Sequence, residues 1–168
     1  MSKEYIIWCD ESVKKGKYYS NFYGGILVSS THLDKVVKIL NSTIKKLKIT
    51  DEIKWQKVNL FHIDAYLKLI DVFFQLVLEG KIKVRIMFRQ NATIAKNLEI
   101  RHHNNEYFLL YYQFVKHGFG FRYSNVTETP IHLRIYFDYL PDTLSKRQQF
   151  KEYIKGLEAT RAFQLAKL

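Results

Sequence analysis

Acidic side chains follow two apolar segments that lie far apart in the sequence. Residues 6–9 are apolar and precede Asp10 and Glu11, and residues 131–137 precede Asp138. A carboxylate at the carboxyl end of a central strand occupies the place where α/β sheets bind their ligands. Burying such groups is costly unless a cation pairs with them, and Mg²⁺ prefers hard oxygen ligands. The pattern indicates a divalent-metal site, and a solvated turn closing a hairpin at Asp10 and Glu11 is the alternative.

A third acid, Glu52, stands two positions before Lys54 in a segment that we expect to be extended over residues 51–58. Side chains two apart in a strand share one face, so Glu52 can hold a metal while Lys54 offsets charge on a phosphorane. Two divalent ions ~4 Å apart can activate a water and steady the leaving oxygen of a phosphodiester. An ordinary surface ion pair has the same sequence pattern.

The chain is strongly basic, with 27 Lys and Arg against 16 Asp and Glu and a formal net charge of +11. Such a field attracts phosphate backbones, which makes RNA or DNA the expected partner. Lys146 and Arg147 fall in the first turn of a helix expected to open at Pro141 and Asp142, where a helix N-terminus can position phosphates. Basic side chains together with clustered acids fit phosphodiester hydrolysis. The alternative for the lysines of residues 35–48 is a solvated helix face.

Other bulk features narrow the class of protein. The single cysteine, Cys9, rules out an internal disulfide, argues against a cysteine-based zinc site and fits a reducing compartment. The apolar run near the start is interrupted by Asp10, so it is no secretory leader. No segment approaches the ~18 apolar residues of a membrane span. We therefore expect a cytoplasmic protein without a membrane partner.

Hydrophobic periodicity predicts the elements that position these residues. Strands are expected over residues 5–12, 17–28, 81–89 and 131–138, and helices over residues 31–47, 64–79 and 106–116 and again from residue 141. The first two strands are joined too closely for a crossover and should be antiparallel. Gly24 and Gly25 indicate a bulge or a close backbone approach. For residues 81–89, strict alternation predicts an apolar inner face and a basic outer face. The length of 168 residues predicts a single domain.

Four segments resemble the bacterial domain-of-unknown-function family 3800. That family has an apolar strand ending in Asp-Glu-Ser, a Glu-x-Lys-Trp segment, a strand ending in Asp, and a late Gln-Leu-Ala-Asp. The corresponding segments here are Ile6-Ile7-Trp8-Cys9-Asp10-Glu11-Ser12, Glu52-Ile53-Lys54-Trp55, Ile135-Tyr136-Phe137-Asp138 and Gln164-Leu165-Ala166. The family is placed among RNase H-like proteins and is often found near phage and mobile-element genes.

The resemblance implies a role for each acid. Asp10, Glu52 and Asp138 would be ligands to Mg²⁺ or Mn²⁺, with Asp10 bridging two ions and with Glu11 and Lys54 close by. The chain departs from the family at Lys167, where the family has Asp, and it stops at Leu168 where family members usually continue through another helix. Either the last ligand is missing or a C-terminal helix is lacking.

The expected fold is a single α/β domain, with an RNase H-like mixed sheet of about five strands flanked by helices on both faces. The expected function is a divalent-metal-dependent nuclease. One alternative, favoured by Lys167, is a non-catalytic nucleic-acid-binding or adaptor protein with a degenerate site. Another is a restriction-type nuclease, which needs its Asp and its Glu-x-Lys on neighbouring strands of one sheet. The RNase H-like fold instead needs Asp10 in mid-sheet beside Asp138.

Overall fold

The computed structural model describes residues 3–93, 105–121, 131–138, 143–159 and 166–167. Contacts divide the chain into two compact units. The sheet unit comprises Met1–Leu27 together with Val84–Leu168, and the helical unit comprises Val28–Lys83. The chain as a whole has an α/β fold with a mixed sheet.

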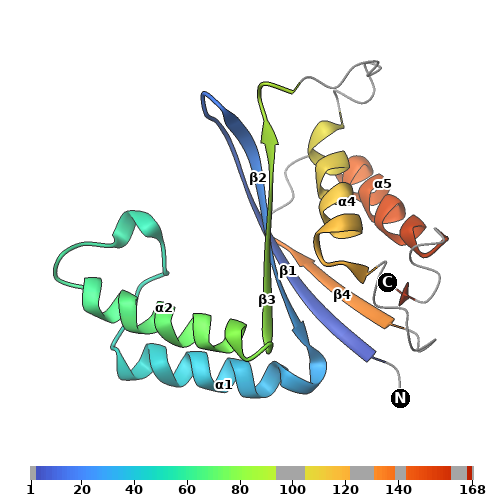
Figure 1. Cartoon of the computed structure of the whole chain (residues 1–168). Coiled ribbons are helices and arrows are strands. Elements are labelled where there is room, and N and C mark those ends of the chain that lie inside the picture. Colours follow the sequence, from blue (N-terminus) through green and yellow to red (C-terminus); the bar gives the residue numbers. More distant parts are fainter. Residues whose placement is uncertain (1–2, 94–104, 122–130, 139–142, 160–165, 168) are drawn as a thin grey trace. The chain divides into compact units, whose positions relative to one another are not determined.

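The sheet has the strand order β3-β2-β1-β4-β5, with β1 in the middle (Figure 1). The strands are β1 (Lys3–Lys15), β2 (Tyr19–Ser29), β3 (Ile82–Gln90), β4 (Ile131–Phe137) and β5 (Ala166–Lys167). Because so few residues separate β1 from β2, these two strands are antiparallel. β1 and β4 are parallel neighbours, and their register runs from Lys3 opposite Ile131 to Cys9 opposite Phe137. Thus four strands are long, and β5, which is parallel to β4, has two residues.

The two faces of the sheet differ in what covers them. On β1, Ile7 and Cys9 are buried on the face that we call the core face, while Trp8 and Asp10 are exposed on the opposite, open face. Ile6 also points to the open face and is buried. The two isoleucines are thus buried on opposite faces of β1, whereas Trp8 is 38% exposed.

Helices α4 (Glu106–Gly118) and α5 (Leu144–Lys155) lie on the core face (Figure 1). Their aromatic side chains form the core with those of the sheet. The ring centroids of Phe137 and Phe150 lie 5.1 Å apart, and those of Tyr111 and Phe137 also lie 5.1 Å apart. On α4, Tyr111 and Phe114 are buried in this core and Tyr107 packs against it.

On β3 the predicted inner face is buried at its start, where Ile82 is 2% exposed, but not further along the strand. Ile86 is 66% exposed and Phe88 is 46% exposed. Arg89, on the opposite side of the strand, forms an ion pair with Glu106 at the start of α4. Alternation shows that the two faces of a strand differ, but the helix that covers one of them lies elsewhere in the sequence. Here α4 lies on the basic face of β3 at Arg89, while Lys83 and Arg85 are exposed.

The close approach expected at Gly24 and Gly25 occurs at Gly25. A Cβ atom on Gly25 would lie 2.8 Å from Cε1 of Phe114, which is 1% exposed and cannot easily move. We expect Gly25→Ala to lower the free energy of unfolding by ~1–3 kcal/mol through overpacking. Gly24→Ala is the matched control, because its Cβ would meet only the Asp10 carbonyl oxygen, at 3.8 Å. Urea unfolding of both variants is the test, and equal stabilities would contradict the expected clash.

The helical unit contains α1 (Ser30–Lys46), the short 3₁₀ helix η1 (Trp55–Lys57) and α2 (Ile63–Leu78). Val36 is buried in α1, whereas Val37, which was expected to be buried with it, is 44% exposed. Helix α2 buries some of its apolar residues and exposes Leu67, Ile70, Phe74 and Leu78. Among the described residues, no helix has the length and apolar character needed to cross a membrane.

Candidate metal and nucleic-acid site

Two of the predicted acids stand side by side in the sheet unit. The paired register of β1 and β4 ends at Cys9 and Phe137, so Asp10 and Asp138 occupy the next positions of two parallel neighbours. The Asp138 backbone N–H donates to the Cys9 carbonyl oxygen over 3.3 Å and continues the ladder by one step. Both side chains are exposed. The sheet thus places Asp10 in mid-sheet beside Asp138.

The spacing of this acid pair suits a divalent cation. Neighbouring strands lie ~4.8 Å apart, so two carboxylates on adjacent strands can reach one ion. The Oδ1 atom of Asp10 accepts a hydrogen bond of 2.8 Å from the Glu11 backbone N–H, which orients the carboxylate. Mg²⁺ is commonly held by one or two carboxylates together with waters and substrate phosphates. Asp10 and Asp138 therefore fit a Mg²⁺ or Mn²⁺ site that a substrate would complete.

Glu11 lies on the other face of β1. Alternation along the strand puts it with Cys9, and its Oε2 atom accepts a hydrogen bond from the hydroxyl of Tyr111 on α4. The Tyr107 hydroxyl is buried and has no hydrogen-bond partner among the described residues. The structure therefore places Glu11 among tyrosines on the core face, away from the open face on which Asp10 stands.

Burial controls how this part of the core titrates. It raises the pKa of the Cys9 thiol to about 12, with a smaller contribution from the Glu11 carboxylate. Burial also raises the pKa values of Tyr23, Tyr107 and Tyr111 above the ordinary value, and the negative charge of Glu11 adds to the effect in each case. All these groups are held in their neutral forms, so none is prepared to act as a nucleophile.

Cys9 should accordingly resist thiol reagents in the folded protein. It is 4% exposed, and a pKa of about 12 leaves on the order of one thiolate in 10⁴ at pH 8. We expect a disulfide reagent such as Ellman's reagent to leave the native thiol unmodified and to react with one thiol per chain in guanidinium chloride. Rapid native labelling at pH 8 would show that β1 opens readily, contrary to its central place in the sheet.

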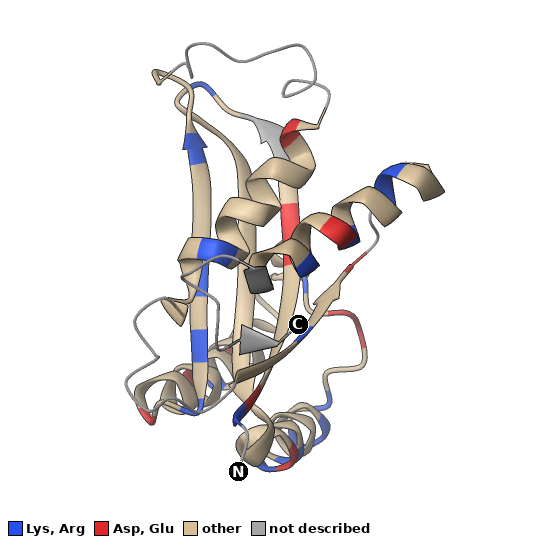
Figure 2. Cartoon of the chain, turned by 90° about the vertical axis from the view of Figure 1, so that its right-hand side faces the viewer, with Lys and Arg blue, Asp and Glu red and all other residues tan. Residues whose placement is uncertain are grey.

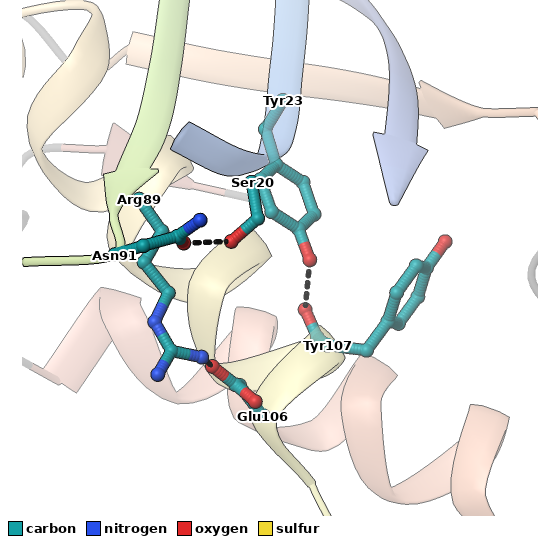
Figure 3. A network of polar contacts seen from close by, with 6 residues as sticks. All are labelled: Ser20, Tyr23, Arg89, Asn91, Glu106 and Tyr107. Carbon is teal, nitrogen blue, oxygen red and sulfur yellow. Dashed lines mark hydrogen bonds and ion pairs between the residues drawn. The ribbon is translucent and has the colours of Figure 1, made fainter. Parts of the chain in front are cut away.

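Polar contacts hold the start of α4 against β2 and β3 (Figure 3). The Tyr23 hydroxyl donates to the Tyr107 carbonyl oxygen over 3.5 Å, and Arg89 pairs with Glu106. Nearby, the Ser20 hydroxyl donates over 2.7 Å to Oδ1 of Asn91, just after β3. These contacts set the position of α4 and hence of Tyr111 beneath Glu11. Helical spacing showed that residues 107 and 111 face inward, but nothing in the sequence paired them with Glu11.

Glu52 and Lys54 belong to the helical unit and form an ion pair with each other. Lys54 Nζ lies 2.8 Å from Oε2 of Glu52, and both side chains are largely exposed. The hydrogen bond from Lys54 is the main reason that the pKa of Glu52 is lowered. This segment precedes η1 and forms no strand of the sheet. The restriction-type alternative needs Glu-x-Lys on a strand beside the Asp, and the structure does not provide that arrangement.

In the part of the chain that the structure describes, no group of three or more His, Cys, Asp or Glu side chains is close enough together to hold a metal ion. Asp10 and Asp138 thus supply a two-carboxylate site within the sheet unit. Any further ligand has to come from substrate, water or another segment.

Lys146 and Arg147 lie at the start of α5, as predicted. The helix begins at Leu144, and the Thr143 side chain caps it by accepting a hydrogen bond of 3.5 Å from the Lys146 backbone N–H. Its expected opening at Pro141 and Asp142 falls outside the described residues. Five residue steps from Asp138 to Thr143 span at most ~17 Å, so the start of α5 lies near the same end of β4 as Asp138.

Residue 167, where the family that this chain resembles has its last acid, lies in a short strand at the other end of β4 from Asp138. Ala166 and Lys167 form β5, and Lys167 is paired with His132 near the beginning of β4. Asp138 stands six residues further along β4, a distance of ~20 Å in a parallel strand. Lys167 therefore does not occupy the place of a ligand beside Asp138.

The fold and the site define an α/β protein with an acid pair where the pairing of its central strand with a parallel neighbour ends; β1 itself continues past Asp10 to Lys15. Comparisons with protein-family models, with curated proteins and with solved structures gave no match. The resemblance to family 3800 therefore stays a prediction, and any function has to be argued from the residues and their geometry.

Proposed function

We propose that this chain is a divalent-metal-dependent nuclease that hydrolyses phosphodiester bonds in RNA or DNA on an RNase H-like sheet. The observation that carries the proposal is the adjacency of Asp10 and Asp138 on the central strand β1 and its parallel neighbour β4. The positive charge of +11 supports a polyanionic substrate. The one cysteine is a free, buried thiol, which fits a reducing cytoplasm.

In this proposal Asp10 and Asp138 hold Mg²⁺ or Mn²⁺ through their exposed carboxylates. A bound ion would lower the pKa of a water molecule and neutralise charge on the phosphoryl oxygens. Lys146 and Arg147, near the N-terminus of α5 on the core face, would bind backbone phosphates further along the strand, beyond the end of β4. Glu52 as a further ligand and Lys54 as a stabiliser of phosphorane charge enter through the resemblance alone. Glu52→Gln and Lys54→Met variants test their contribution to cleavage.

A cleavage assay on labelled single-stranded RNA, single-stranded DNA and duplexes is the direct test. We expect products with Mg²⁺ or Mn²⁺ and none with EDTA. Products of equal yield in EDTA would exclude the proposed reaction.

A second function is favoured by one observation, which is that the described residues bring together fewer than three metal-ligating side chains. In this alternative the chain binds nucleic acid without cleaving it and serves as an adaptor. Saturable binding without products under either metal would select it over the nuclease.

Binding itself should depend steeply on salt concentration. Basic side chains occur on several strands and helices (Figure 2), so several phosphates should be neutralised in a complex. Each one contributes ~0.9 to the slope of log K against log salt on duplex DNA and ~0.7 on single strands. Fluorescence anisotropy between 50 and about 300 mM KCl measures this slope. A flat response, or no binding at low salt, would remove the nucleic-acid partner altogether.

A further inference from the structure

Two exposed aromatic rings lie immediately beside the acid pair. Trp8 of β1 and Tyr136 of β4 are register partners, and their rings are stacked with centroids 5.9 Å apart and planes 13° apart. They remain 38% and 46% exposed on the open face of the sheet. Each stands two residues before an acid, so each ring lies ~7 Å along its strand from Asp10 or Asp138, on the same face.

The open face carries more aromatic surface on β2 and β3. Phe88 contacts Phe22 with ring centroids 5.8 Å apart and Tyr19 with centroids 4.9 Å apart. All three of these rings are more than one third exposed. Large aromatic side chains bury their area when a core is available, so the gathering of these exposed rings on the open face indicates a binding surface.

We infer that Trp8 and Tyr136 form a stacking platform for the bases of single-stranded RNA or DNA. This inference rests on the proposed function, because it takes nucleic acid as the ligand. It adds that the ligand is single-stranded. Aromatic side chains stack on any base, but the bases of a duplex are already stacked on one another and present no free faces. A base on this platform leaves its sugar and phosphate within reach of the acid pair.

The charges around the platform favour a nucleotide over an apolar protein partner. Asp10 and Asp138 stand at one side, and at the other Arg134 Nη2 lies 2.7 Å from Oε1 of Glu4. A protein surface that covered the rings would also desolvate these charged groups at high cost. A nucleotide instead places its polar sugar beside these groups, and the net charge of +11 attracts the strand.

Intrinsic fluorescence gives a direct test. The chain has two tryptophans, and Trp55 is 85% exposed, so a Trp55→Phe variant makes Trp8 the sole reporter without disturbing a core. Titration with oligo(dT) and oligo(U) in EDTA, which prevents cleavage, should quench Trp8 saturably. The matching duplexes should quench it far less. Quenching by duplex equal to that by single strands would overturn the single-stranded assignment.

Substitutions of Trp8 and Tyr136 measure how much each ring contributes to single-strand affinity. We expect Trp8→Ala and Tyr136→Ala each to weaken single-strand affinity by about 5- to 150-fold, the range for losing one stacked base. Trp8→Phe and Tyr136→Phe, which keep a ring, should retain most of the affinity and guard against a general folding defect. Tyr153→Ala on α5 is the matched control, because Tyr153 is also 46% exposed, and it should bind as the wild type does.

The outcomes separate the platform from the nuclease. Unchanged affinity in both alanine variants, with cleavage intact, would overturn the platform and leave the nuclease standing. Quenching and binding without cleavage under either metal would support the platform and remove the nuclease. Binding to no nucleic acid would overturn both. If the wild type self-associates in light scattering and Trp8→Ala restores the monomer without affecting nucleic-acid affinity, the open face docks protein and the platform is overturned.

Discussion

Asp10→Asn is expected to abolish metal-dependent cleavage, reducing its rate by at least ~10²–10³-fold, the loss typical of removing one preorganised electrostatic contact. The amide keeps the shape of the side chain but loses the charge that would hold the cation beside Asp138. Stability should stay the same or rise slightly, because two neighbouring carboxylates repel each other. Single-turnover cleavage with Mn²⁺ and urea unfolding measure the two effects on one preparation.

Two further variants make the Asp10 result specific. Asp138→Asn should lose cleavage to a similar extent, and the double variant should be little worse than either single one if both carboxylates hold the same ion. Asp71→Asn is the matched control, because Asp71 is an exposed aspartate of α2. Undiminished cleavage in Asp10→Asn, or unfolding of the variant, would make Asp10 a structural residue and the proposed mechanism wrong.

The second large effect concerns alkaline pH. In the unfolded chain, cysteine and tyrosine lose their protons near pH ~8.5 and ~10, respectively. In the folded protein, burial raises the pKa of Cys9 to about 12 and raises those of Tyr23, Tyr107 and Tyr111. The folded state therefore binds more protons than the unfolded state above pH ~9, so the free energy of unfolding should fall as pH rises. Each group can add up to ~1.4 kcal/mol per pH unit.

Tyr111→Phe isolates one member of this group. At pH 7 it should lower the free energy of unfolding by ~1–3 kcal/mol, because Glu11 loses the hydroxyl that donates to it. Between pH 10 and 11 the free energy of unfolding should also fall less steeply with pH in this variant. The reason is that the difference in bound protons between the folded and unfolded states is smaller by about one. Urea unfolding at stepped pH measures both effects, with Tyr153→Phe on the exposed side of α5 as control. A decline as steep as that of the wild type would mean that Tyr111 ionises without unfolding.

Local pattern was enough to locate most elements and the candidate acids of the sheet unit. The alternation of residues 131–137 predicted β4 with Asp138 at its end, and the inner face of α4 agrees with helical spacing. The apolar run before Asp10 predicted the central strand. Such patterns are readable because side chains repeat every two residues in a strand and every 3.6 residues in a helix, whatever the rest of the chain does.

Tertiary structure decided which of these residues meet. The parallel pairing of β1 with β4 brings Asp10 beside Asp138 across more than 100 residues of sequence, and β5 carries Lys167 to the opposite end of β4. The adjacent acids Asp10 and Glu11 are separated because successive side chains of a strand point to opposite faces and α4 covers only one of them. Alternation marks two faces on every strand, but the packing of distant helices determines which face is buried and which is left to bind a ligand.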